Sequence, residues 1–262
     1  MQTDIFIPAR LDSTRLPEKH LQEINHVPII KHLVNRLNSC NSIKNIIVCT
    51  TNSKHDDKLV QFLEKENILT FRGSKLDILE RFLNASRKFN TDIIIDVEAD
   101  KIYTDPKYVD QIANEMQDSK IDFITGNNSS SILDPEFIFH GFIPAGINVK
   151  TLNKICQLKN TNNTETGYKE FFTSNDFIKK KFIIPKKNIK LPKKFRFSID
   201  YPEDLTLAKV IFSQLGPNFN TTDLLKFVEK NPQLQNIINP VIDKWKNHYK
   251  TNITNFDLQN SD

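Results

Sequence analysis

Glycine is scarce in this chain of 262 residues, which contains only six. Neither G-x-x-x-x-G-K-[ST] nor G-x-G-x-x-G occurs, so the glycine-rich loops of common ATPases and dinucleotide-binding proteins are absent. The sequence also lacks H-E-x-x-H, C-x-x-C and G-x-S-x-G. Their absence removes the sequence support for a zinc peptidase, a structural zinc site or a serine hydrolase.

Cysteines and long apolar runs are scarce as well. The three cysteines, Cys40, Cys49 and Cys156, are odd in number and widely spaced, which favours a reducing cytoplasm without disulfides. No apolar run approaches about 18 residues, and the N-terminus leads directly into a strand-like segment, so we expect neither a signal peptide nor a transmembrane helix. With 38% hydrophobic and 26% charged residues, the composition is that of a globular protein.

The net charge of +4 is mild, with one concentration of lysines. Residues 179–196 hold eight lysines and one arginine, divided by Ile-Ile-Pro and by Ile-Lys-Leu-Pro. A nucleic-acid surface would combine such charges with aromatic stacking residues or a recognition helix. We therefore interpret the segment as a strand and a solvated connection, with contact to a polyanionic substrate or surface as the alternative, and expect no nucleic-acid partner.

Two kinds of apolar segment alternate along the chain. Short runs rich in Ile and Val predict strands, and apolar residues every three or four positions predict helices. Strands are predicted at 4–8, 43–49, 68–71, 92–97, 121–125 and 142–149, and helices at 29–37, 55–66, 76–89, 106–117, 200–213, 221–230 and 238–249. This alternation is typical of an α/β fold, a Rossmann-like, mostly parallel sheet with helices on both faces.

The predicted domain organisation is simple. Residues 127–131 predict a loop, and residues 132–200 show a less regular pattern with several strand-like pieces. Gly216-Pro217 separates the last two predicted helices from the rest. We find no internal repeat and no linker long enough to separate two folding units. The prediction is one α/β domain at 1–215 and a small C-terminal helical extension at 216–262 packed on it.

A polar loop follows the first predicted strand. Residues 9–19 hold two of the seven arginines of the chain, together with a lysine and two hydroxyls. In an α/β sheet, backbone N–H groups and cationic side chains at the carboxyl end of a strand commonly hold a phosphate group. The loop therefore predicts a binding site for a phosphate-bearing ligand.

Two aspartates are candidate metal ligands. Asp100 lies three residues after the strand predicted at 92–97, at the edge of the sheet where ligands bind. A carboxylate there could hold Mg²⁺ against a triphosphate, and the alternative is an ordinary loop residue. Asp200 directly precedes Tyr-Pro-Glu-Asp. Capping of the following helix explains Asp200 by itself, and taken alone we favour that interpretation.

The polar loop resembles a known nucleotide-binding signature. Ile7-Pro-Ala-Arg-Leu-Asp-Ser-Thr-Arg-Leu-Pro-Glu-Lys19 is similar to the signature of the cytidylyltransferases that activate sugar acids, shared by 3-deoxy-manno-octulosonate cytidylyltransferases and SpsF-type polysaccharide proteins. The resemblance continues through Arg72-Gly-Ser-Lys-Leu-Asp-Ile-Leu-Glu-Arg81, Ala99-Asp100 and Ile199-Asp-Tyr-Pro-Glu-Asp-Leu205, in SpsF-type order and spacing. It covers nearly the whole chain and implies the nucleotide-diphospho-sugar transferase fold.

The resemblance also implies roles for particular residues. By this resemblance the loop 9–19 wraps the triphosphate of CTP, and Arg10, Arg15 and Lys19 are the catalytic residues. Residues 72–74 would lie beside the base and ribose. Asp100 and Asp200 would together hold Mg²⁺, and the related enzymes suggest a homodimer. The residues assigned to nucleotide binding are Pro8, Ala9, Arg10, Ser13, Lys19, Arg72, Gly73, Ser74 and Glu98.

Several positions depart from the family pattern. Glu18 replaces the glycine usual before the lysine, which puts a carboxylate near the phosphates or points it to solvent. Lys101-Ile102-Tyr103 replaces a proline-containing turn after the metal aspartate. Asn148 and Lys150 stand in place of carboxylates, and Phe171 in place of a histidine. Most of these changes lie in the half expected to receive the acceptor, so the resemblance does not identify the acceptor.

The sequence therefore predicts a Mg²⁺-dependent enzyme that moves CMP from CTP to an anionic acceptor and releases pyrophosphate, for surface polysaccharide or related biosynthesis. The acceptor is a sugar acid, a phosphate or a phosphonate, and Lys150 and Lys169 favour a negatively charged one. Arg15 and Lys19 would stabilise the departing pyrophosphate, and we expect no side chain of general-base character to converge there.

Two alternatives belong to other classes of protein. One is a catalytically inactive nucleotide-binding regulator or subunit, suggested by the altered acceptor half and by Glu18. The other is a glycosyltransferase, which shares the sheet type. A glycosyltransferase would carry a D-x-D pair at the metal strand, and Asp96-Val-Glu-Ala-Asp100 does not provide one.

Overall fold

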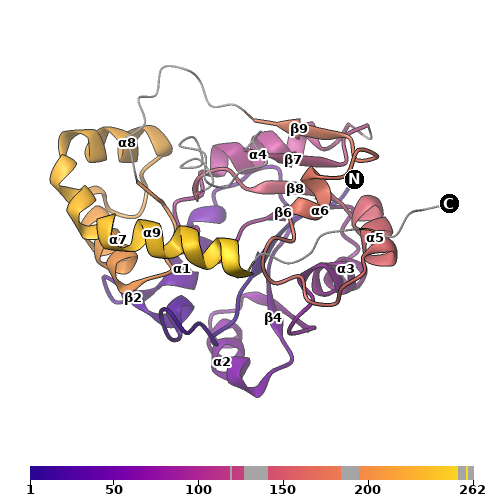
Figure 1. Ribbon diagram of the computed structural model, residues 1–262, viewed down its shortest axis with the longest axis horizontal. Helices are drawn as coiled ribbons and strands as arrows, with labels where there is room; N and C mark the ends of the chain where they lie inside the picture. Colours follow the sequence, from indigo (N-terminus) through magenta and orange to yellow (C-terminus); the bar gives the residue numbers. More distant parts are fainter. Residues whose placement is uncertain (119, 127–140, 184–194, 253–257, 259–262) are drawn as a thin grey trace.

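The computed structural model describes residues 1–118, 120–126, 141–183, 195–252 and 258 (Figure 1). Within these residues, seven strands form one sheet in the order β5-β4-β1-β6-β8-β7-β9, and β2 and β3 form a small hairpin. The strands are β1 Thr3–Pro8, β2 Glu23–Ile24, β3 Val27–Pro28, β4 Ile46–Thr51, β5 Leu69–Gly73, β6 Ile93–Asp96, β7 Phe123–Thr125, β8 Ala145–Asn148 and β9 Lys180–Phe182. The helices are α1 Ile29–Leu37, α2 Asp57–Lys65, α3 Ile78–Phe89, α4 Pro106–Glu115, α5 Val149–Leu158, α6 Glu170–Thr173, α7 Pro202–Leu215, α8 Thr221–Lys230 and α9 Gln235–Asn252.

Most neighbouring strands in the sheet are parallel. β1 pairs in parallel with both β4 and β6, and β4 pairs in parallel with β5. β8 runs antiparallel to β6 and β7, and β7 pairs in parallel with β9. The predicted mostly parallel α/β fold is therefore confirmed. One consequence positions the site, because the carboxyl ends of β1, β4, β5 and β6 all meet at the same edge of the sheet.

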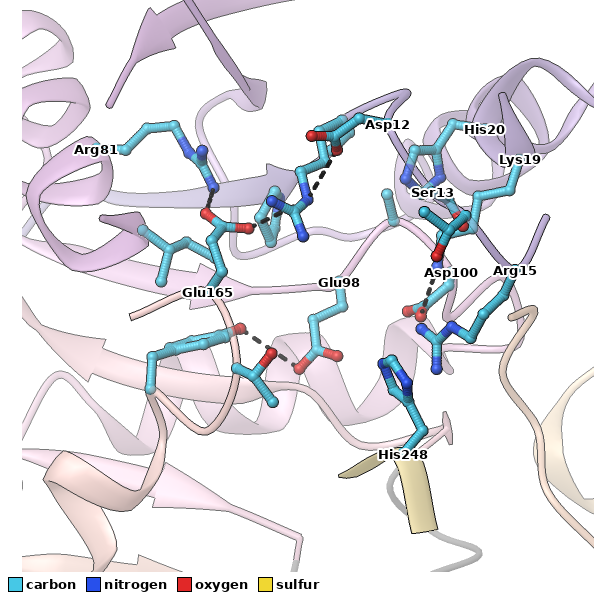
Figure 2. Close-up of a pocket in the computed structure, with 18 residues that line it drawn as sticks. Asp12, Ser13, Arg15, Lys19, His20, Arg81, Glu98, Asp100, Glu165 and His248 are labelled. Carbon is cyan, nitrogen blue, oxygen red and sulfur yellow. Dashed lines mark hydrogen bonds and ion pairs between the residues drawn. The ribbon is translucent and has the colours of Figure 1, made fainter. Parts of the chain in front are cut away.

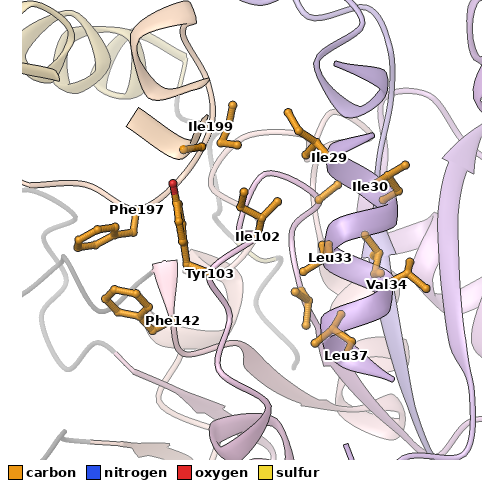
Figure 3. Close-up of a cluster of buried hydrophobic side chains, with 14 of the residues drawn as sticks. Ile29, Ile30, Leu33, Val34, Leu37, Ile102, Tyr103, Phe142, Phe197 and Ile199 are labelled. Atoms are coloured by element: carbon orange, nitrogen blue, oxygen red, sulfur yellow. The ribbon is translucent and has the colours of Figure 1, made fainter. Parts of the chain in front are cut away.

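Alternating side chains place two apolar clusters on opposite faces of the sheet. In β1, Ile5 and Ile7 belong to one cluster and Phe6 to the other. Helices α1, α2, α4 and α7 pack on the first face, and α3, α5 and α6 pack on the second. Figure 3 shows part of the first cluster, where the apolar side of α1 lies near Tyr103, Phe142 and Phe197. Both faces of the sheet are thus buried, as the continuous Ile and Val runs predict.

The C-terminal helices share the core of the first face. Leu224 and Val228 of α8 and Ile238 and Val241 of α9 are buried in the same cluster as β1. α9 also packs along α7, and Figure 1 shows it running from the side of α7 and α8 toward the middle of the molecule. In the part of the chain that the structure describes, no helix combines the length and the apolar character needed to cross a membrane.

Two helices of the structure differ from the sequence prediction. α5 was not predicted as a helix, because Asn148 both ends β8 and caps α5, its side-chain oxygen accepting from the N–H of Lys150 at 2.9 Å. With no loop between them, strand and helix look like one irregular segment. The last helix begins at residue 235 and continues through Pro240, earlier than predicted. The loop predicted at 127–131 lies outside the described residues, as does part of the lysine-rich segment.

Replacing Gly146 with alanine is expected to destabilise the packing of α4 on β8. A Cβ at this position would lie 2.5 Å from Cγ2 of Ile112 and 3.0 Å from Cγ of Met116. Overpacking of this kind typically costs about 1–3 kcal/mol of unfolding free energy. Urea unfolding of Gly146→Ala measures that loss. In the double variant with Ile112→Ala the loss should be smaller than the sum of the two single losses, and additive losses would contradict this account.

Candidate active site at the carboxyl ends of the strands

A cavity of about 350 Å³ opens at the carboxyl ends of β1 and β6. Its walls come from the loop after β1, the segment after β6, the start of α3, residues 165–168 and α9, and Figure 2 shows them facing a common space. The lining residues are Pro8, Ala9, Arg10, Asp12, Ser13, Thr14, Arg15, Lys19, His20, Ile78, Arg81, Glu98, Ala99, Asp100, Glu165, Thr166, Tyr168 and His248. Most of the residues assigned from the resemblance therefore gather in one place.

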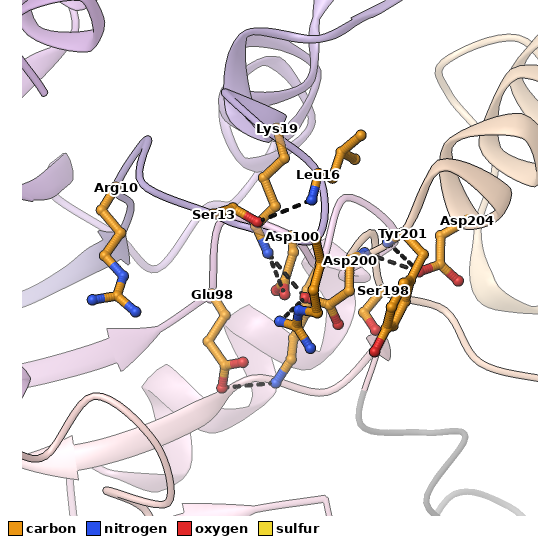
Figure 4. Close-up of polar contacts among 12 residues, drawn as sticks. Arg10, Ser13, Leu16, Lys19, Glu98, Asp100, Ser198, Asp200, Tyr201 and Asp204 are labelled. Carbon is orange, nitrogen blue, oxygen red and sulfur yellow. Dashed lines mark hydrogen bonds and ion pairs between the residues drawn. The ribbon is translucent and has the colours of Figure 1, made fainter. Parts of the chain in front are cut away.

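Lys19 connects the two candidate metal ligands. Its Nζ lies 3.1 Å from Oδ2 of Asp100 and 3.1 Å from Oδ1 of Asp200 (Figure 4). The same Oδ1 of Asp200 accepts from Nη2 of Arg15 at 2.8 Å. The fold thus brings together residues that lie a hundred positions apart in sequence, with cations of the loop between them.

Asp200 is held from a second side by Arg196. The guanidinium of Arg196 pairs with Oδ2 of Asp200 and with Oδ2 of Asp204, the latter at 2.9 Å. Asp204 also accepts from the backbone N–H groups of Asp200 and Tyr201, both at 2.9 Å. Asp204 therefore caps the start of α7 by reaching back one turn. The interpretation of Asp200 as the helix cap is wrong, because its carboxylate faces Lys19 and Arg15 instead.

Burial and neighbouring charges shift the pKa values of these groups in opposite directions. Burial would raise the pKa of Asp200, but Lys19, Arg196 and Arg15 outweigh it and hold that pKa well below its usual range. Burial raises the pKa of Asp100, and the charge of Asp200 adds to the rise while Lys19 opposes it. For Lys19, burial alone would lower the pKa, but Asp100 and Asp200 together raise it. Asp200 is thus firmly ionised, whereas the ionised form of Asp100 is destabilised by its surroundings.

The donor set at this end of the cavity fits Mg²⁺. Oδ1 of Asp100 is buried and accepts no hydrogen bond. Among the described residues, no three or more His, Cys, Asp or Glu side chains are grouped so that they could hold a metal ion. Two carboxylates without further protein ligands suit Mg²⁺, which usually takes one or two carboxylates and completes its shell with phosphate oxygens and water. The same set is unsuited to zinc, which prefers three or four protein ligands.

Arg10 and Ser13 line the cavity on the other side of the loop. The Nε of Arg10 lies 3.1 Å from Asp12 and 3.4 Å from Glu165, and the side chain is 38% exposed. Oγ of Ser13 accepts from the N–H of Leu16 at 3.3 Å, which fixes the turn that carries Arg15. Both side chains face the space where the triphosphate is expected. Their roles in binding stay predictions.

Residues 72–74 take a different position. Arg72, Gly73 and Ser74 are not among the described residues that line the cavity. Arg72 donates to the carbonyls of Thr51 and Ser53 at 2.9 and 2.8 Å and pairs with Asp57, so it fastens the loop after β4. Ser74 reaches the site only through Arg81, whose Nη1 donates to its carbonyl at 2.8 Å. Their contact with the base and ribose therefore stays a prediction, and these three residues lie outside the lining of this cavity.

Glu98 lies at the cavity wall between two lysines. Its Oε1 is 3.0 Å from Nζ of Lys101 and 2.5 Å from Nζ of Lys169, and Lys169 also pairs with buried Asp96 at 3.0 Å. Burial lowers the pKa of Lys101 to about 8, against the opposing effect of Glu98. The hydroxyl of Tyr168 donates to Asp96 at 2.7 Å. The positive charges of Lys101 and Lys169 are balanced by the negative charges of Asp96 and Glu98. Lys169 therefore brings no net positive charge to the acceptor.

The lining residues without an individual role assigned from the sequence include Arg81, Glu165, Tyr168 and His248. Arg81 is almost fully buried and pairs with Glu165 at 2.8 Å, and the hydroxyl of Tyr168 lies 3.4 Å from Oε1 of Glu98. His248 enters from α9, which contradicts the expectation that no side chain of general-base character converges on the site. Arg81 belongs to the segment 72–81 that resembles the family, so the sequence offered a reason to assign it to the site. Glu165 and Tyr168 lie in the irregular part of the sequence and His248 in the predicted extension, where no motif marked them.

The departures from the family pattern mostly lie away from the cavity. Glu18 has a left-handed backbone with φ of 50°, which explains the usual glycine, and its carboxylate pairs with Lys58 at 2.6 Å. Lys150 is exposed at the start of α5, and Phe171 is buried in the core. The argument for an anionic acceptor from Lys150 and Lys169 is therefore not supported. The position of Glu18 also removes one reason to suspect an inactive protein.

The parallel sheet, the cationic loop after its first central strand and the paired carboxylates define a nucleotide-binding α/β protein. The cytidylyltransferase family model matches residues 5–209, so the chain belongs to this family and is a CTP-dependent cytidylyltransferase. It is 24% identical over 240 residues to the spore coat polysaccharide biosynthesis protein SpsF of Bacillus subtilis, covering 87% of this chain and 94% of that one.

Solved structures agree. A cytidylyltransferase of Leptospira borgpetersenii is 26% identical, with a TM-score of 0.77 over 89% of this chain and 96% of the other. A CMP:2-keto-3-deoxy-manno-octonic acid synthetase complexed with CTP has the same fold, with a TM-score of 0.59 at 17% identity over 82% of this chain and all of the other. These matches give no support to the glycosyltransferase alternative.

Proposed function

We propose that this cytidylyltransferase transfers CMP from CTP to a sugar acid, or to another acceptor with an acid group, in the biosynthesis of a surface polysaccharide. The observation that carries the proposal is that Arg15, Lys19 and Asp100 line one end of the cavity and that Arg15 and Lys19 both pair with buried Asp200. Two kinds of relative support the acceptor class. SpsF is named for spore coat polysaccharide biosynthesis, and another relative, from Ruthia magnifica, is a 3-deoxy-manno-octulosonate cytidylyltransferase with 27% identity over 152 residues.

The transfer needs charge stabilisation more than covalent chemistry. An acceptor oxygen forms a bond to the α-phosphorus of CTP and, if it is a hydroxyl, releases its proton to solvent. The bond from that phosphorus to its bridging oxygen breaks, and pyrophosphate leaves with the electron pair. Arg15 and Lys19 are suited to stabilise the negative charge that develops on the pyrophosphate. In the free protein both cations are paired with aspartates. The triphosphate therefore competes with those carboxylates for the cations when it binds.

Asp100 and Asp200 are the residues that would hold Mg²⁺. When bound, this ion supplies positive charge that offsets the charge of the phosphate oxygens. The chain's own contribution is to keep the two carboxylates close together, with Lys19 between them. Arg196 fixes the orientation of Asp200 from behind, so this carboxylate needs little reorganisation when the ligand enters.

A direct assay tests the proposed function. The protein is incubated with CTP and MgCl₂ and with one acceptor at a time, namely 3-deoxy-manno-octulosonate, another sugar acid, a sugar phosphate and an alkylphosphonate. We expect pyrophosphate release with at least one acid and none with a neutral sugar of similar size. No release with any acceptor, together with no rise in melting temperature on addition of CTP, would contradict the proposal.

Removal of divalent cations is expected to stop the transfer. Without a cation, a bound triphosphate would be repelled by the carboxylate of Asp100 at the cavity wall and by that of Asp200, which lies next to it through Lys19. Excess EDTA should reduce pyrophosphate release to the background rate, and MgCl₂ added beyond the EDTA should restore it. ZnCl₂ serves as the comparison and is expected to restore it less well, because the site offers only two protein ligands. Equal rates in EDTA and in MgCl₂ would exclude this role for the two aspartates.

A further inference from the structure

α9 lies beyond the part of the chain that the family model matches, yet it forms a wall of the cavity. The match ends at residue 209, and α9 begins at residue 235. Ile238, Val241, Trp245 and His248 follow one another at intervals of three, four and three residues, so they lie on one side of the helix. Ile238 and Val241 are fully buried in the core. This anchored side of α9 continues directly into the site.

Trp245 and His248 bring α9 into contact with the charged end of the cavity. The ring of Trp245 lies 5.0 Å from the guanidinium carbon of Arg196, the residue that holds Asp200. One turn later His248 lines the cavity, and Figure 2 shows its ring directed toward the end that holds Arg15 and Asp100. Partial burial and the charge of Arg15 lower the pKa of His248, whereas Asp200 opposes this change. An imidazole carries at least one N–H donor in either charge state, so His248 is chemically able to donate to an anion.

Arg15 approaches the same space from the opposite wall. Its guanidinium pairs with Asp200 through one nitrogen and lies 5.3 Å from the centre of the Tyr201 ring. The side chain is 25% exposed and lines the cavity. A guanidinium offers five N–H donors, so one ion pair leaves others for a ligand. Donors from the loop and from α9 thus face one another across the entrance to the charged end.

We propose that Arg15 and His248 form an anion subsite, in which a phosphate or carboxylate oxygen of a substrate accepts one hydrogen bond from each. The identity of the anion rests on the proposed function, and it belongs either to the triphosphate and its pyrophosphate product or to the acid group of the acceptor. His248 is then a substrate-binding residue supplied by a helix outside the matched family region.

Calorimetric titrations of CTP, pyrophosphate, 3-deoxy-manno-octulosonate and uncharged cytidine into the wild type and His248→Ala test this subsite. Loss of one hydrogen bond to an anion is expected to weaken binding by about tenfold. If the anion is that of the nucleotide, CTP and pyrophosphate weaken. If it is that of the acceptor, only the sugar acid weakens. His248→Gln retains an N–H donor and should recover part of the loss.

Three outcomes would overturn the proposal. They are unchanged binding of every anion to His248→Ala, an equal loss for cytidine, and no binding of any anion by the wild type. Asn247→Ala, an exposed neighbour outside the cavity lining, is the control and should bind all four probes as the wild type does. The emission of Trp245, the one tryptophan of the chain, provides a second measure of binding. If no acceptor supports pyrophosphate release, the proposed function fails, but the titrations still decide whether the subsite exists.

Discussion

Replacing Asp200 with asparagine is expected to lower both the stability and the transfer rate of this enzyme. The carboxylate of Asp200 is paired with three cations, Arg15, Lys19 and Arg196. An amide cannot balance their charge, and these cations are largely buried. Removing one partner from a buried ion pair costs about 3–5 kcal/mol. We expect the lower end of this range, because Lys19 keeps Asp100 and Arg196 keeps Asp204.

The melting temperature measures the loss of stability. A loss of about 3 kcal/mol lowers it by roughly 6–12 °C in a chain of this size. The pKa of Asp200 lies below its unfolded value, so its contribution is fully present at neutral pH and decreases as the pH falls below about 4. The difference between wild type and Asp200→Asn should therefore shrink in acid. An exposed aspartate, Asp243, gives the matched control, since Asp243→Asn should have the wild-type melting temperature.

The transfer rate of Asp200→Asn should fall along with stability. The variant loses a predicted metal ligand and also the group that orients Arg15 and Lys19. A reduction on the order of a hundredfold or more is expected in pyrophosphate release, measured at a temperature at which the variant is folded. A stable Asp200→Asn variant with the wild-type rate would show that Asp200 is neither a structural counter-ion nor a ligand.

Local patterns in the sequence predicted most of the fold. The strands of Ile and Val and the helices between them follow from periodicity alone, because burial on both faces of the sheet demands it. The exceptions are local. Asn148 joins β8 to α5 without a loop, and Pro240 lies inside α9, where a proline usually marks an end. In both cases tertiary packing determines the element, and a single window of sequence does not contain that packing.

The candidate site also contains residues that local sequence predicts and residues that only tertiary packing brings there. Arg10, Arg15 and Lys19 follow a strand within one loop, so their common location could be read from the sequence. Asp200 was ambiguous, since its position before a helix suggests a cap, and only the side chain of Asp204 resolves that question. His248 could not be predicted, because its place in the cavity depends on how α9 packs against α7.

Asp100→Asn is expected to separate activity from stability. Asp100 is paired with Lys19 alone among the ion pairs of the described residues, and one of its oxygens has no hydrogen-bond partner. Burial and the charge of Asp200 raise its pKa. A carboxylate with a raised pKa is more easily ionised in the unfolded chain, so its charge destabilises the fold at neutral pH. The neutral amide removes this penalty, and Lys19 keeps Asp200 as its partner.

The melting temperature of Asp100→Asn should therefore equal or exceed that of the wild type. Its rate of pyrophosphate release should fall on the order of a hundredfold to a thousandfold, because a predicted ligand of the cation and the negative charge that attracts this cation are lost. The rise in melting temperature that CTP causes in the presence of MgCl₂ should shrink as well. If Asp100→Asn instead transfers CMP at the wild-type rate, the metal assignment is wrong. If the melting temperature of Asp100→Asn is as low as that of Asp200→Asn, the two carboxylates are equivalent structural partners of Lys19. The proposal that Asp200 stabilises the fold while Asp100 does not would then be wrong.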